Sequence, residues 1–220
     1  MQQLTVEIWS DIVCPWCYIG KRRFEAALAR FAHRDQVQLV WRSFELDPNT
    51  PRRTTGSLSD MLAQKMGVSR AQATAMNAQV TGLAANEGLE YHLDQAQHGN
   101  TFDAHRLIHL AAARGLQGEM TERLMRAYFT EGLAISDPAT LVTLGAEIGL
   151  PADAVRAMLD SDEYAEAVRA DAQRAAMFGI RGVPFFAINE QYGVSGAQPA
   201  DTFLNVLEQV WTDSYSQPAE

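Results

Sequence analysis

The chain has 220 residues, of which 47% are hydrophobic and 20% are charged, proportions that are ordinary for a globular protein. The length suits one domain with an insertion, or two small domains, and is enough for a sizeable core. The formal net charge of −9 argues against nucleic acid or an anionic membrane as the main partner, because both select basic surfaces.

The start of the chain bears on its location in the cell. Met1-Gln2-Gln3 leads directly into an apolar strand, with no charged-then-apolar leader before it. The sequence also has no uninterrupted apolar run long enough to span a bilayer. These features predict a cytoplasmic protein with no membrane partner. In a reducing cytosol, a lone pair of cysteines is more often catalytic or metal-binding than structural.

The first fifty residues are expected to form a β-α-β unit. Leu4–Trp9 is an apolar run typical of a strand, and Tyr18–Phe31 carries apolar residues at helical spacing. Val37–Phe44 alternates apolar and polar residues, as a second strand does. A turn with two prolines follows, and Arg52–Gly56 is interpreted as a polar linker.

A long helical block comes next, from about Leu58 to Phe178, where Ala, Leu, Met, Gln, Glu and Arg dominate. Ser69 is a candidate cap for the helix that starts at Arg70, and Asp137-Pro138 resembles an N-cap followed by an N1 proline. The predicted helices are Leu58–Met66, Arg70–Glu87, Thr101–Arg114, Glu119–Thr130, Pro138–Ile148, Ala152–Leu159 and Glu163–Phe178.

Strand character returns near the end of the chain. Pro184–Asn189 and Tyr192–Ser195 are predicted to form a hairpin joined at Glu190-Gln191, and a last helix is expected at Ala200–Trp211. The order β-α-β, helices, β-β-α predicts an α/β thioredoxin fold that is split by a large all-helical insertion. The sheet domain would be discontinuous, covering residues 1–50 and 178–220, with the insertion at 57–177.

The two cysteines of the chain, Cys14 and Cys17, enclose Pro15-Trp16 where the first strand should turn into the first helix. A C-x-x-C at such a junction is typical of thioredoxin-like redox proteins. Cys14 falls at the N-cap, where its sulfur can accept hydrogen bonds from the amides of Trp16 and Cys17, and Pro15 falls at N1. The same amides and the helix dipole stabilise a thiolate, so Cys14 is the expected attacking sulfur. Trp16 is expected to be exposed and to contact substrate.

A second chemical landmark is Val183-Pro184, directly before the late strand. In a thioredoxin fold this strand begins with a cis proline that faces the C-x-x-C, so the bond is predicted to be cis, with an ordinary trans proline as the alternative. Pro184 brings no N–H or ionisable group near the sulfurs. The Val183 backbone could pair with an extended substrate in the manner of an added strand.

Four motifs occur in order along the chain: Ser10-Asp11-x-x-Cys14-Pro15-Trp16-Cys17-Tyr18-x-Gly20, Asn100-Thr101-x-x-Ala104-His105-Arg106-Leu107, Gly179-Ile180-x-Gly182-Val183-Pro184-Phe185-Phe186 and Val194-Ser195-Gly196-Ala197-Gln198. Together they resemble the DsbA-like thioredoxin superfamily, in its FrnE-type branch. The resemblance implies a thiol–disulfide oxidoreductase or disulfide isomerase with a helical domain that caps the active site.

The resemblance also implies roles for individual residues. Cys14 matches the nucleophile, Cys17 the resolving thiol, Pro184 the cis proline, and Glu7 the buried acid that family members use as a proton relay. The alternative for Glu7 is a solvent-facing strand residue. Family members often have histidine between the cysteines, where this chain has Trp16. Tryptophan cannot stabilise a thiolate by charge, so a less oxidising couple is expected.

The second motif leaves two interpretations open. His105 could be a hydrogen-bonded histidine at a domain boundary, or Asn100 and His105 could lie beside the groove and bind substrate. A zinc site is a further alternative, because Cys14 and Cys17 with His105 and His109 satisfy a Cys2His2 set. The spacing does not match a compact zinc module, so no metal is expected.

The expected function is thiol–disulfide exchange on a disulfide- or dithiol-containing protein or a small thiol. No bound cofactor is expected, glutathione is a candidate redox partner, and monomer and homodimer both stay open. One rival is a glutathione-dependent transferase or isomerase of the kappa or hydroxychromene-carboxylate type. Those relatives usually have serine at the position of Cys14, so the intact cysteine pair favours the redox function. A binding module or chaperone with incidental cysteines is the third class.

Overall fold

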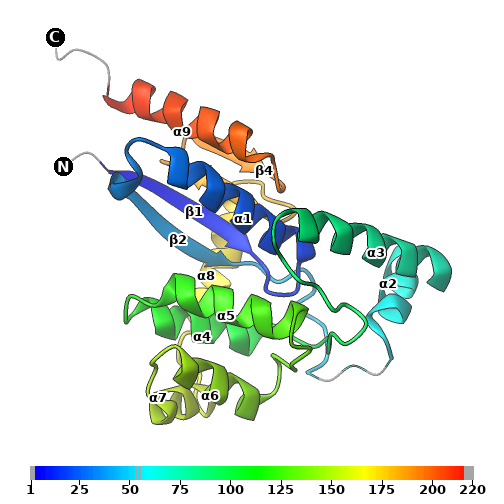
Figure 1. The fold of residues 1–220 in the computed structure, drawn as a ribbon. Helices are drawn as coiled ribbons and strands as arrows, with labels where there is room; N and C mark the ends of the chain where they lie inside the picture. The colour runs from blue at the N-terminus through cyan, green and yellow to red at the C-terminus, as the bar shows by residue number, and fades with distance from the viewer. Residues whose placement is uncertain (1–2, 53, 55, 216–220) are drawn as a thin grey trace.

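A mixed β-sheet forms the centre of the computed structural model, which describes residues 3–52, 54 and 56–215 (Figure 1). Within these residues the sheet has four strands in the order β2-β1-β3-β4. Strand β1 pairs in parallel with β2 and antiparallel with β3, and β3 pairs antiparallel with β4. The sheet confirms the predicted α/β thioredoxin fold. The strands are β1 (Leu4–Ser10), β2 (Val37–Ser43), β3 (Phe185–Ile188) and β4 (Tyr192–Ser195).

Strand β1 is buried along nearly its whole length because it has a strand on each side and helices over both faces. Successive side chains of a strand point to opposite faces. Val6 and Ile8 pack in the main core, on the side of helix α1 (Pro15–Arg30). Trp9 packs on the other face, where its indole Nε1 donates a hydrogen bond to Asp171 O at 3.1 Å.

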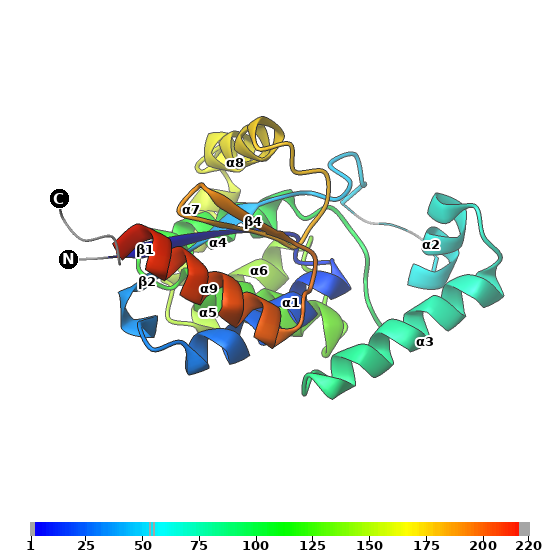
Figure 2. The same ribbon diagram turned by 90° about the horizontal axis from the view of Figure 1, so that it is seen from above.

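Helices α1 and α9 (Ala200–Tyr215) cover one face of the sheet, and α8 (Ala165–Met177) covers the other (Figures 1 and 2). Phe24 of α1 joins these layers. Its ring stacks on Phe186 of β3 at 5.3 Å between centroids and meets Phe203 of α9 edge-on at 5.5 Å. Full burial of such a ring stabilises the fold by roughly 1.5–3 kcal/mol.

The helical block contains α2 (Leu58–Met66), α3 (Arg70–Asn86), α4 (Phe102–Ala112), α5 (Gln117–Phe129), α6 (Pro138–Glu147) and α7 (Ala152–Leu159). The α2–α3 pair projects away from the sheet (Figure 2). Several helix starts follow from the sequence. Ser69 caps α3 in a capping box with Gln72, and Asp137 caps α6 ahead of Pro138. Both predicted caps are confirmed.

Three local details differ from the prediction. The hairpin turn is centred on Asn189 and Glu190, with φ of 50° and 58°, rather than on residues 190–191. Positive φ at both central residues is the type I′ geometry that matches the twist of paired strands. A short 3-10 helix (Arg34–Gln36) precedes β2, and the last helix continues to Tyr215 instead of ending at Trp211.

The position of α8 bears on the division into domains. The sequence assigns α8 to the insertion at 57–177, yet Arg174 of α8 forms ion pairs with Glu7 of β1. Helix α8 thus contacts both the sheet and α4 of the helical block. The ranges 1–50, 178–220 and 57–177 stay a prediction. Within the predicted linker Arg52–Gly56, Arg53 and Thr55 lie outside the described residues.

A cluster of charges joins the sheet domain to the helical block. Glu122 of α5 accepts hydrogen bonds from Lys21 and Arg22 of α1 and from the Tyr18 hydroxyl, the last at 2.6 Å. Burial alone would raise the pKa of the Glu122 carboxyl, but these cations outweigh it and lower the pKa to about 2. The ion pairs therefore stabilise the contact between α1 and α5 at neutral pH.

We expect Glu122→Gln to lower the free energy of unfolding by about 1–3 kcal/mol at pH 7. The folded-state pKa lies below the unfolded value of about 4.3, so this stabilisation is present above the unfolded pKa and is lost as pH falls toward 2. Urea unfolding of both proteins at a series of pH values should show the difference shrinking below about pH 5.

Glu25→Gln is the matched control, because Glu25 bonds the same two cations but its side chain is 43% exposed. The Glu25→Gln variant should lose no more than about 0.5 kcal/mol in the free energy of unfolding. Equal losses for the two variants, or a difference that does not change with pH, would contradict this account of the α1–α5 contact.

Candidate active site

The reactive pair sits at the first turn of α1. Cys14 occupies the N-cap with φ −86° and ψ 112°, and Pro15 is at the start of the helix, as predicted. The expected bonds from the amides of Trp16 and Cys17 to the Cys14 sulfur are not made in the described chain. The Cys17 amide donates instead to Cys14 O at 3.0 Å, and the Cys14 thiol lies 3.6 Å from Val183 O. A protonated thiol acts as a donor, which explains this arrangement.

The two thiols differ in their surroundings. Both are free, and Cys14 is 4% exposed while Cys17 is 1% exposed. Burial raises the pKa of the Cys17 thiol well above its ordinary value, and the adjacent Cys14 raises it further. The Ser10 hydroxyl and the Asp11 backbone oppose that rise. Cys17 therefore holds its proton, and Cys14 is the sulfur nearer to solvent.

The rim of the site lies around Cys14. Trp16 is 44% exposed, as expected for a residue between the cysteines. Gly182 is also exposed and Val183 is half-buried. Cys14 itself is 4% exposed and lies between these residues and the interior.

The Val183–Pro184 peptide bond is cis, as the sequence predicts. Pro184 packs against the first turns of α1 at Gly20. A Cβ built on Gly20 would lie 2.9 Å from Pro184 Cγ, closer than carbon atoms approach in real structures. The Gly196 amide donates to Pro184 O at 2.8 Å and holds the segment from its other side. Glycine at position 20 thus allows the proline to lie beside the cysteines.

His105 is placed inside the protein rather than on its surface. It is 2% exposed on α4, and its Nε2 lies 3.4 Å from Asp11 Oδ1. This burial argues against the expected contact with substrate and favours the boundary interpretation. Asn100 bonds backbone atoms, with Nδ2 donating to Pro48 O at 3.3 Å and Oδ1 accepting from Phe102 N at 2.9 Å. Its contacts hold the start of α4 against the loop after β2.

Glu7 is buried, but the structure does not bring it to the cysteines. Its carboxylate accepts hydrogen bonds from Arg42 at 2.8 Å and from Arg174 at 2.7 Å, on the sheet face that α8 covers. Helix α1 and Cys17 lie on the opposite face. Burial would raise the pKa of the Glu7 carboxyl, but the hydrogen bonds from Arg174 and Arg42 lower it below its ordinary value. The Glu7 carboxylate therefore links β1 to β2 and to α8 through its ion pairs with Arg42 and Arg174.

Several residues near the cysteines received no role from the sequence. The Tyr91 hydroxyl donates to Pro15 O at 2.8 Å, and its ring stacks on Phe129 of α5 at 4.5 Å. Tyr91 lies in a loop, and no motif marks it. Ser10 and Asp11 stand in the first motif, but their place next to Cys17 depends on the turn geometry.

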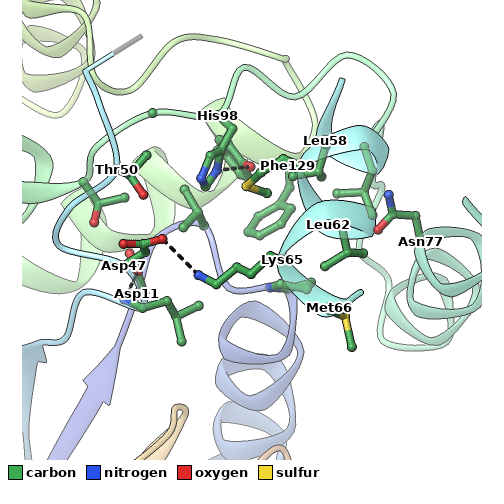
Figure 3. A pocket seen from close by; sticks show the side chains of 18 residues that line it. Asp11, Asp47, Thr50, Leu58, Leu62, Lys65, Met66, Asn77, His98 and Phe129 are labelled. Atoms are coloured by element: carbon green, nitrogen blue, oxygen red, sulfur yellow. Dashed lines mark hydrogen bonds and ion pairs between the residues drawn. The ribbon is translucent and has the colours of Figure 1, made fainter. Parts of the chain in front are cut away.

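A cavity of about 350 Å³ lies beside the active-site loop (Figure 3). Val13 and Pro15 form one wall, and apolar side chains of α2 such as Leu58 and Leu62 form another. Lys65 reaches from α2 to Asp47, at 3.3 Å, and these two exposed side chains bring the cavity to the surface. The cavity can hold an apolar group next to the C-x-x-C.

The zinc alternative finds no support in the described part of the chain, where no group of three or more His, Cys, Asp or Glu side chains is arranged to hold a metal. His109 points to other partners. Its Nε2 lies 3.0 Å from Asp171 Oδ2 and 3.1 Å from Ser43 Oγ.

A family model described as the DSBA-like thioredoxin domain matches residues 5–208. The chain belongs to this family. Among solved structures it is similar to a probable DsbA oxidoreductase from Streptomyces coelicolor, with 46% sequence identity and a TM-score of 0.92. That match covers 99% of this chain and 93% of the other. Cys14-Pro15-Trp16-Cys17 and Val183-Pro184 lie within the matched residues.

More distant structures share the fold alone. A 2-hydroxychromene-2-carboxylate isomerase is 12% identical with a TM-score of 0.74, over 98% of this chain and 100% of the other. The cytosolic disulfide reductase DsbM from Pseudomonas aeruginosa, solved with GSH, is 22% identical with a TM-score of 0.62, over 94% and 98%. None of the described helices has the length and apolar character needed to cross a bilayer.

Gly20→Ala tests the contact between α1 and the proline. The new methyl group would collide with the Pro184 ring, and the expected net loss is about 1–2 kcal/mol in the free energy of unfolding. Gly82→Ala is the control, because Gly82 is an exposed residue of α3 with open space around it. The Gly82→Ala variant should gain up to about 1 kcal/mol in the free energy of unfolding, because alanine favours a helix more than glycine does. Urea unfolding would contradict the packing account if both variants were stabilised alike.

Proposed function

We propose that this protein is a thiol–disulfide oxidoreductase that works through the Cys14–Cys17 dithiol. The observation that carries the proposal is the difference between the two sulfurs. Cys14 caps a helix beside the exposed Trp16, whereas Cys17 is enclosed one turn later and keeps its proton. An outer attacking thiol with an inner, protonated partner is the arrangement that thiol–disulfide exchange needs.

The reaction would run in two exchange steps. The Cys14 thiolate attacks one sulfur of a substrate disulfide, the substrate S–S bond breaks, and its other sulfur leaves as a thiolate. Cys17 then loses its proton and attacks Cys14 Sγ, which forms the Cys14–Cys17 disulfide and releases the second substrate sulfur. The substrate gains two electrons and the enzyme dithiol loses them. The reverse order oxidises a substrate dithiol.

The surroundings of Cys14 support an extended substrate. Val183 is half-buried next to Cys14, and its backbone can add a substrate strand beside the active-site loop. Trp16 offers a large exposed ring to the same substrate. A disulfide-containing protein or peptide, or a small disulfide, fits this rim. We also propose protein disulfide isomerase activity at the same site, because the sequence motifs resemble the FrnE-type branch.

Glutathione is the redox partner we propose. The structure of DsbM, which shares the fold, was solved with GSH. Tryptophan rather than histidine between the cysteines leaves the thiolate without a neighbouring side-chain cation, which favours reduction of substrates over strong oxidation. A reductase that draws electrons from glutathione would act in the cytoplasm, where thiols are kept reduced.

Cysteine variants test the proposal through insulin reduction with glutathione as electron donor. Cys14→Ser should lower the rate to the uncatalysed level, because the one remaining cysteine, Cys17, is enclosed and protonated. Cys17→Ser should lower it by at least about 100-fold and leave a mixed disulfide at Cys14 that mass spectrometry detects. Activity that survives in Cys14→Ser would refute the mechanism.

The same preparations separate this function from its rival. A glutathione-dependent transferase or isomerase would conjugate or isomerise a small electrophile and would need only the first cysteine. If Cys17→Ser kept full activity with such a substrate, while the unaltered protein reduced no disulfide, the rival function would be correct.

A further inference from the structure

A cluster of buried and half-buried polar side chains begins beside Cys17. It consists of Ser10 at the end of β1, Asp11 in the following turn, Glu45 in the loop after β2 and His105 on α4. Asp11 is 1% exposed, and Ser10 and His105 are buried as well. The exchange mechanism gives no role to any of these residues.

Each member of this buried polar cluster has an atom that finds no hydrogen-bond partner among the described residues. The atoms are Ser10 Oγ, Asp11 Oδ1, Glu45 Oε1 and His105 Nε2. An unpaired buried polar group costs about 1–3 kcal/mol, and native proteins keep few of them. Four such atoms close to a reactive thiol indicate that these residues take part in the reaction rather than only fill the core.

Asp11 and His105 are arranged as a carboxylate–imidazole pair. His105 Nε2 lies 3.4 Å from Asp11 Oδ1, and Asp11 Oδ2 accepts the Leu46 amide at 2.8 Å, which fixes the carboxylate. When a neutral imidazole beside a carboxylate takes up a proton, the result is an ion pair. Its attraction offsets part of the cost of a buried charge. The pair is therefore suited to accept a proton inside the protein.

Ser10 lies near Cys17 and shares a small cavity with His105. The Ser10 hydroxyl and the Asp11 backbone are the groups that favour the ionised form of Cys17. Ser10 and His105 both line a small internal cavity of about 10 Å³, close to the volume that one water needs. Asp11 also lines the larger cavity beside the active-site loop, where Lys65 and Asp47 form an ion pair (Figure 3).

The other titratable or charged groups around the pair are Glu45, His98, Tyr128 and Arg42. Burial raises the pKa of Glu45, partly countered by His105, and burial lowers the pKa of His98, partly countered by Asp11. Burial also raises the pKa of Tyr128. Burial thus shifts all three groups toward their neutral forms. Arg42 is held by Glu7 and Asp171.

We propose that the Asp11–His105 pair, acting through Ser10, takes the proton from Cys17 when Cys17 attacks the Cys14–substrate mixed disulfide. The Cys17 S–H bond breaks, His105 receives the proton, and the electron pair on Cys17 forms the new S–S bond. The bond from Cys14 to the substrate sulfur breaks, and the substrate leaves as a thiolate. In the reverse direction the pair returns the proton to Cys17. This inference rests on the proposed function and assigns the relay to residues other than Glu7.

Stopped-flow reaction of the reduced protein with dithio-bis-nitrobenzoate tests the proposal. The first equivalent of coloured thiol reports attack by Cys14, and the second reports attack by Cys17. Asp11→Asn and His105→Gln should slow the second phase on the order of 100-fold near neutral pH. The first phase should stay within about twofold, because the pair acts only on Cys17.

The pH profile separates proton transfer from a structural effect. In the variants the second phase should rise steadily with pH and approach the unaltered rate in alkali, where Cys17 ionises without help. Ser10→Ala should show the same profile and gives a second test if Asp11→Asn does not fold. His109→Gln is the matched control, one helical turn from His105, and should leave both phases unchanged.

Several outcomes would overturn the inference. They are an unchanged second phase in His105→Gln and Ser10→Ala, a slowing that is equal at every pH, and a slowing confined to Glu7→Gln. A protein that releases no coloured thiol in either phase would instead refute the proposed function. The two failures are therefore distinguishable.

Discussion

The contact between the first turns of α1 and the Val183–Pro184 segment is the constraint on which the site depends. It joins parts of the chain that are far apart in sequence, since Gly20 meets the Pro184 ring and the Cys14 thiol lies 3.6 Å from Val183 O. At this contact Cys14 is 4% exposed, whereas Trp16 is 44% exposed. Cys17, one turn into α1, is 1% exposed, and this burial raises its pKa. The different chemistry of two identical side chains thus follows from packing.

The polar side chains on the two faces of β1 have different roles. On the α8 face, Glu7 and Asp171 hold Arg42 and Arg174 in an ion-pair network that fastens the layers together. On the α1 face, the strand ends at Ser10, beside the cysteines. On the α8 face the carboxylates form ion pairs with cations, and these ion pairs stabilise the fold. The Asp11 carboxylate lies 3.4 Å from His105 instead, and to this pair we assign the uptake of the Cys17 proton.

Much of the fold was predictable from the sequence because its signals are local. Capping residues such as Ser69 and Asp137 mark helix starts, and C-x-x-C with Val-Pro marks both sides of the site. The pairing of Asp11 with His105 was not predictable, since nothing local links a turn to a helix that far along the chain. Glu7 was assigned a relay role by resemblance. Which face of β1 it occupies depends on α8, whose docking the sequence does not reveal.

In the proposed mechanism Cys14 is the accessible, attacking sulfur, and Cys17 is enclosed and protonated. Brief alkylation of the reduced, folded protein with iodoacetamide at neutral pH, followed by peptide mass spectrometry, tests this claim most directly. Modification of Cys14 well before Cys17, with both modified once the protein is unfolded in urea, is the predicted result. Equal modification of the two cysteines in the folded protein, or earlier modification of Cys17, would contradict it.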